Sequence, residues 1–172
     1  MKRPMQPRIL GLSALVLTLS VALSTTASAQ ASPVVEVSFE KPEGFTDAYP
    51  RSRSGSSEEL QETLNEVTRL FTEQAARHLK AGDRLKVTIT DLDLAGEIEP
   101  GRTGAMSLRV LRPINWPRMS LRYTFTRDGK ASSAEAKLSD PGYQDNSGTC
   151  ARVGGLCYEK QMVGRWMQRQ FG

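Results

Sequence analysis

Apolar and polar residues alternate along four stretches of the chain, and this two-residue period predicts β-strands. The stretches are VVEVSF at 34–39, RLKVTITDLDL at 84–94, RMSLRYTFTR at 118–127 and KASSAEAKLS at 130–139. Asp128-Gly129 separates the last two and is a strong hairpin-turn signal. The pattern MSLRVL at 106–111 is compatible with a further short strand, within a segment at 95–117 that otherwise shows no regular period.

Two other segments repeat their apolar residues every three or four positions, which predicts amphipathic helices at 56–80 and 156–171. The first helix begins with a capping box, in which Ser56 precedes Glu59 by three positions. It ends in basic residues followed by Gly82, which is typical of a helix C-terminus. A loop at 41–55, rich in proline, glycine and serine, separates this helix from the first strand.

The order of these elements predicts the fold class. We expect one α+β domain, with a single mixed sheet of about four strands and two helices packed on one face. The first two strands flank a helix, so they should pair in parallel through a right-handed crossover.

The N-terminus has the pattern of a secretory signal peptide. Basic residues lead into an apolar run at 9–23, and small residues at Ala27 and Ala29 make a cleavage site. The run is shorter than the roughly 20 residues of a membrane span. We therefore expect cleavage after Ala29, a single domain at 30–172 and a periplasmic or secreted protein with no later membrane span.

Cleavage changes the charge of the chain. The whole chain has 23 basic and 19 acidic residues, but three of the basic residues lie in the leader. The mature chain is then nearly neutral, which argues against a globally basic nucleic-acid-binding protein.

Cys150 and Cys157 are the two cysteines of the chain. In an exported protein two thiols usually form a structural disulfide. A redox pair is the alternative, but redox motifs favour a C-x-x-C spacing that is absent here.

The stretch TDLDLAGEIEPG at 90–101 contains the candidate metal ligands Asp91, Asp93 and Glu97. It begins like a calcium loop, but Ala95 and Arg102 stand where that loop needs oxygen ligands. No metal or other cofactor is therefore predicted. The apolar parity also flips at Asp91, which suggests a bulge or the end of a strand. We favour carboxylates that cap loop amides or pair with arginines over a cation site.

Six arginines and no lysine or acidic residue lie between positions 102 and 127. Arginine binds phosphate and carboxylate with two parallel hydrogen bonds and stacks on aromatic rings. The candidate ligand-binding residues are Arg112, Trp116, Arg118 and Arg122. The alternative, which we favour on general grounds, is a solvated sheet face whose arginines pair with the acidic stretch.

No catalytic set is complete. The chain has one histidine, His78, beside basic residues at a predicted helix end, where it complements the helix dipole. Nucleotide-binding glycine motifs and the serine-hydrolase motif are absent, and SFEK at 38–41 lacks the partner motifs of an S-x-x-K enzyme.

Five stretches together resemble a family of exported bacterial proteins known as domain of unknown function 3016. They are VEVSFEKPEGFTD at 35–47, VTITDLDLAGEIEPG at 87–101, INWPRMSLRY at 114–123, LSDPGY at 138–143 and YEKQMVGRW at 158–166. The resemblance covers nearly the whole mature chain and implies a periplasmic or secreted setting with no known activity. Gly101 departs from the family pattern, which has a tryptophan there, and the two cysteines are not part of it.

Three functional hypotheses follow. The first is a non-catalytic module that binds an envelope polymer or a periplasmic protein through the arginine and aromatic residues. The second is a metal-binding protein or hydrolase built on Asp91, Asp93 and Glu97. The third is a structural protein with neither property.

Overall fold

The structure is a computed structural model that describes residues 32–172, apart from 53–54, 101–106, 147–149, 151–152 and 154. The predicted signal peptide at 1–29 and its cleavage site lie outside the described residues, as does Gly101. Among the described residues, no helix has the length and apolar character needed to cross a membrane.

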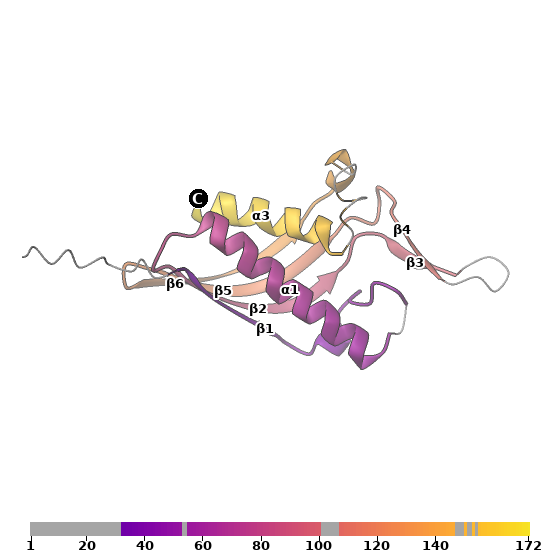
Figure 1. The fold of residues 1–172 in the computed structure, drawn as a ribbon, viewed down its shortest axis with the longest axis horizontal. Helices are drawn as coiled ribbons and strands as arrows, with labels where there is room; N and C mark the ends of the chain where they lie inside the picture. Colours follow the sequence, from indigo (N-terminus) through magenta and orange to yellow (C-terminus); the bar gives the residue numbers. More distant parts are fainter. Residues whose placement is uncertain (1–31, 53–54, 101–106, 147–149, 151–152, 154) are drawn as a thin grey trace, which may run out of the picture.

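A mixed four-stranded sheet and two helices form the domain, as the sequence predicts (Figure 1). The strand order is β1-β2-β5-β6, in which β1 and β2 are parallel and the other pairs are antiparallel. The two helices pack against each other on one face of the sheet. The bounds are β1 Val34–Phe39, α1 Ser57–His78, β2 Arg84–Asp93, β5 Arg118–Arg127, β6 Lys130–Ser139 and α3 Cys157–Phe171.

The hydrophobic core lies between the helices and the sheet. Trp166 of α3 belongs to this core and makes edge-to-face contacts with Phe71 of α1, Tyr123 of β5 and Phe171. The other face of the sheet carries short polar and charged side chains, such as the Ser38–Thr88 hydrogen-bonded pair. One buried and one solvated face explain why the alternation in the sequence predicts these strands well.

The sequence predicts either a bulge or the end of a strand near Asp91, and the structure has a β-bulge there. Ile89 lies opposite Leu121 and Asp91 lies opposite Ser120, so Thr90 is the extra residue of β2. The extra residue returns Leu92 to the core face, where it is fully buried. The bulge therefore keeps the core continuous to the end of the strand.

Sequence periodicity missed one element. The sequence predicts an irregular segment at 95–117 apart from a short strand at 106–111, and β4, Leu108–Val110, lies within that strand. The structure adds β3, Glu97–Glu99, which pairs with β4. This small hairpin extends away from one end of the main sheet (Figure 1). Gly96 begins it with a φ of 82°, and a Cβ there would lie 2.7 Å from the carbonyl oxygen of Val110, so glycine is required.

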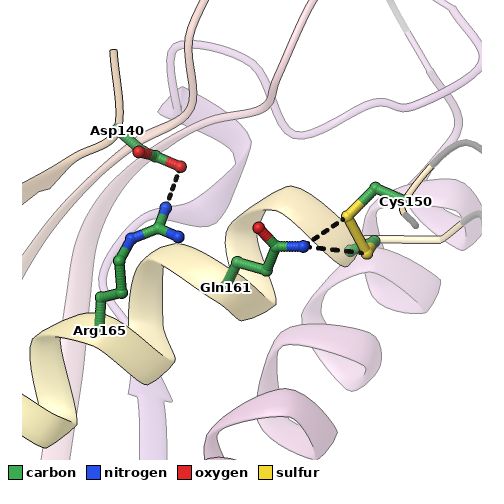
Figure 2. The surroundings of a disulfide bond; sticks show 5 residues. Asp140, Cys150, Gln161 and Arg165 are labelled. Atoms are coloured by element: carbon green, nitrogen blue, oxygen red, sulfur yellow. Dashed lines mark hydrogen bonds and ion pairs between the residues drawn. A yellow bond between two sulfur atoms is a disulfide. The ribbon is translucent and has the colours of Figure 1, made fainter. Parts of the chain in front are cut away.

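Cys150 and Cys157 form the predicted disulfide, with their Cα atoms 5.3 Å apart. Gln161 of α3 donates a hydrogen bond to the Cys150 sulfur at 3.1 Å, and Arg165 on the next turn pairs with Asp140 (Figure 2). These contacts attach the loop after β6 to α3.

A buried ion pair closes the opposite end of the domain. Asp83, only 2% exposed, accepts two hydrogen bonds from Arg127 at 2.7 and 3.0 Å and one from the Lys80 amide. Arg127 also donates to the carbonyl oxygen of Phe171, at the end of α3. The pair therefore joins the α1–β2 turn, β5 and the C-terminus.

We expect Asp83→Asn to lower the free energy of unfolding by about 2 kcal/mol at pH 7, because the charged hydrogen bonds are lost. The hydrogen bonds from Arg127 hold the pKa of Asp83 below its usual value of 3.8. Their contribution is therefore complete above that value and is lost as the pH falls through the lowered pKa of the folded state. Urea unfolding at pH 7 and at about pH 3 should show a difference that shrinks in acid. Glu40→Gln, which breaks an exposed pair with Arg122, is the control and should change stability little.

Candidate functional site

A cleft of about 710 Å³ lies between the loop after β1 and the base of the β3–β4 hairpin. We call it the hairpin cleft. Its described lining residues include four carboxylates, two aromatic rings and one arginine: Glu43, Phe45, Thr46, Asp47, Tyr49, Gly55, Asp93, Gly96, Glu97, Ile98, Asn115 and Arg118. The acidic stretch and one of the candidate arginines therefore meet in one place.

The loop after β1 is fixed to β2 through backbone and carboxylate contacts. The amide of Asp47 donates to the carbonyl of Leu92 at 2.9 Å, and the amide of Leu94 donates to the carbonyl of Asp47. Asp91 accepts hydrogen bonds from both the amide and the hydroxyl of Thr46, at 2.8 and 3.0 Å. Asp91 is thus a cap for loop amides, as the favoured interpretation of the acidic stretch has it.

Arg109 of β4 is the main connection between the walls of the cleft. Its guanidinium donates to four backbone carbonyls, those of Tyr49, Pro50, Ala95 and Gly96, at 2.8 to 3.2 Å. It also pairs with the carboxylate of Asp47 at 2.8 Å, and its side chain is only 16% exposed. A single side chain therefore holds the loop, the turn after β2 and the hairpin together.

The carboxylate of Asp47 has a raised pKa although it pairs with an arginine. Burial raises its pKa, against the opposing effects of the charge and hydrogen bonds of Arg109, and nearby Asp93 raises it further. Asp93 in turn pairs with Arg118 at 2.7 Å. The two acids are neighbours, because Asp47 and Asp93 form a backbone bridge.

Glu159 of α3 is hydrogen-bonded to the turn that begins the β3–β4 hairpin. It lies in the first turn of α3, is 2% exposed, and accepts a hydrogen bond from the amide of Ala95 at 2.8 Å. Burial raises its pKa more than the Ala95 hydrogen bond and the charge of Arg109 lower it. Glu159 thereby ties the helix layer to the turn that begins the hairpin.

The four candidate ligand-binding residues do not share one surface. Arg118 lies over the ring of Trp116, 4.3 Å from its centroid, and lines the hairpin cleft. Arg122 lies on the open face of the sheet and pairs with Glu40. Arg112 pairs with Glu99 at 2.6 Å. Two of the arginines thus pair with the acidic stretch itself.

The candidate metal ligands are not gathered into a metal site. Asp91 is directed to Thr46, Asp93 to Arg118, and Glu97 accepts from Asn115. Within the described ranges, no group of three or more histidine, cysteine, aspartate or glutamate residues could hold a metal ion. The positions at 90–101 that the structure describes form a strand end, a turn and a hairpin strand.

Three residues of the site were missed by sequence reasoning: Asp47, Arg109 and Glu159. Glu159 precedes Met162, Val163 and Trp166 by three, four and seven positions, and this spacing places it on the buried face of the helix. That signal was available in the sequence. Asp47 and Arg109 carry no comparable local signal.

The fold and the cleft define an α+β domain with a polar, carboxylate-rich hollow beside a small hairpin. Residues 33–169 match the model of the family described as "Protein of unknown function (DUF3016)", and the chain belongs to this family. The resemblance found in the sequence is thus confirmed. No curated protein and no solved structure matches the chain.

We expect Glu159→Gln to make the protein more stable than the wild type at pH 7, by a few degrees in thermal midpoint, and equally stable near pH 4. The folded state binds the proton of Glu159 more tightly than the unfolded chain does. Wild-type stability therefore falls as the pH rises from the usual pKa of 4.5 through the raised value. Glutamine keeps an oxygen for the Ala95 amide but has no charge to bury.

Thermal unfolding of both proteins from about pH 4 to pH 8 checks this expectation. A variant that is less stable than the wild type at pH 7 would show that the ionised carboxylate stabilises the fold. The control is Glu36→Gln, at an exposed position of β1 that pairs with Lys86, where little pH-dependent difference is expected.

Proposed function

We propose that this chain is an exported, non-catalytic protein of the bacterial cell envelope, and that the hairpin cleft binds an envelope polymer. The observation that carries the proposal is the lining of the cleft. It combines carboxylates, an amide, a tyrosine ring and an arginine stacked on tryptophan in one hollow. Concave sites with a few convergent polar groups are the usual places where ligands bind.

Peptidoglycan is the polymer that we favour, because each chemical group of the cleft has a partner in it. Its peptide stems carry carboxylates, which suit the guanidinium of Arg118. They also carry amino groups, which suit Asp93 and Glu97, while the glycan hydroxyls suit the amide of Asn115. Tyr49 offers an aromatic surface with a polar end, as is common where a ligand is partly wet.

A binding role suits the way in which the carboxylates are held. Asp47 is fixed by Arg109 and Asp93 by Arg118. Such pairing favours a preorganised surface over proton transfer. The one histidine of the chain, His78, is the last residue of α1 and does not line the cleft.

The other two candidate arginines have a secondary role in this proposal. Arg112 and Arg122 lie outside the cleft lining and would contact flanking parts of an extended polymer. The ring of Trp116 stacks against the guanidinium of Arg118. Its indole nitrogen donates a hydrogen bond to the hydroxyl of Ser139 at 2.9 Å. We therefore expect Arg118 to be the most sensitive of the four.

Co-sedimentation with purified peptidoglycan sacculi tests the proposal. The full-length chain is expressed with its leader, and the exported protein is purified. We expect the wild type to bind saturably and Arg118→Glu to bind about tenfold more weakly or worse, because a charged hydrogen bond is replaced by repulsion. Arg122→Glu should cause a smaller loss, and Lys130→Glu, at the exposed start of β6, should bind like the wild type.

Arg118→Glu also loses its pair with Asp93, so circular dichroism and the thermal midpoint must show that the variant is folded. The proposal fails if folded wild-type protein does not sediment with sacculi, or if Arg118→Glu binds equally well.

Mass spectrometry of the exported protein should give an N-terminus at Gln30, and retention of the full chain in the cytoplasm would contradict the envelope setting.

A further inference from the structure

Strand β6 forms a long edge of the main sheet. It is last in the strand order and pairs along ten residues with β5, without a bulge. In the described part of the chain its outer side has no neighbouring strand. Natural proteins usually protect such edges with proline, bulges, short strands or charged side chains. β6 has no proline and is longer than β1, the six-residue strand at the other edge.

The side chains of β6 leave room for another strand. Six of its ten residues are alanine or serine, and these include Ser133, Ala134, Ala136 and Ser139 in its second part. Its charged residues are Lys130, Glu135 and Lys137. An incoming backbone could therefore approach closely, and its choice of register would depend mainly on the two charges at 135 and 137.

The pairing with β5 fixes which side chains share a face. Ala136 lies opposite Leu121 and is on the helix face, whereas Glu135 lies opposite Arg122 and is on the open face. Lys137 shares the open face with Glu135, two positions along the strand. The open edge therefore carries an adjacent negative and positive charge, a pattern that is complementary to itself when read in the reverse direction.

We propose that this chain forms a homodimer in which β6 pairs antiparallel with β6 of a second copy, about a two-fold axis at Ala136. A two-fold axis perpendicular to the sheet keeps the helices of both copies on the same side, so residues on the same face must meet. This register places Glu135 opposite Lys137 of the second copy, and the symmetry repeats the pair. On the helix face, Ala134 meets Leu138 of the second copy.

Neighbouring registers are disfavoured by charge. A centre at Glu135 would place two glutamates opposite each other, and a centre at Lys137 would do the same with two lysines. A centre at Ala134 would leave Glu135 opposite Ser133 and Lys137 opposite Ala131, with no ion pair across the strands. Like charges in directly opposed positions destabilise a strand pair, and opposite charges stabilise it. The register at Ala136 is therefore the one that the sequence of β6 supports.

A charge exchange tests this pairing. The full-length chain is exported, and its mass is measured by analytical ultracentrifugation over a range of concentrations. We expect a concentration-dependent dimer for the wild type. Glu135→Lys should weaken the dimer about tenfold or more, because two attractive pairs become repulsive. The double variant Glu135→Lys/Lys137→Glu restores opposite charges in the same register and should restore the dimer.

Lys130→Glu is the matched control, since Lys130 lies outside the paired segment in this register and should not affect the dimer. Thermal unfolding shows whether each variant is folded, because residue 135 also faces Arg122 in its own sheet. The proposal is overturned if the wild type is monomeric at every concentration. It is also overturned if Glu135→Lys dimerises normally, or if the folded double variant stays monomeric.

Discussion

The buried guanidinium of Arg109 is the contact on which the site depends. The loop after β1 and the turn after β2 have backbone carbonyls that no regular secondary structure satisfies, and Arg109 satisfies four of them at once. Its charge is balanced by Asp47 within the same contact. A buried charge with incomplete partners would be costly, so the contacts of Arg109 favour the arrangement of the loop, the turn and the hairpin that forms the cleft.

The domain thus has a simple physical plan. An apolar core between the helices and the sheet supplies most of the stability, and a polar cluster closes each end. At one end, Asp83 and Arg127 join the α1–β2 turn to the C-terminus. At the other end, Arg109, Asp47 and Glu159 hold a hollow open to solvent. The first cluster is compact and closed, whereas the second surrounds a space, and this difference is why we place the function at the hairpin.

The main sheet and helices could be predicted because each has one buried face, which leaves a period in the sequence. Even the bulge at Thr90 left a trace, as a flip of parity at Asp91. Strand β3 could not be found, since Ile98 is its one apolar residue and a single apolar residue between two glutamates shows no period. The sequence does not distinguish Arg109 from the five other arginines at 102–127, because its partner Asp47 is 62 positions away along the chain. The cleft therefore depends on long-range contacts that no local pattern records.

Hydrogen exchange of the Arg109→Lys variant tests the central claim most directly. Lysine keeps the charge but lacks the planar fork that reaches several carbonyls. We expect the amides of Asp47, Leu94 and Gly96 to lose protection, while those of Val87 and Tyr123 in the central strands stay protected. Unchanged protection at the three cleft amides would show that the loop, turn and hairpin hold together without the guanidinium, and would contradict the account.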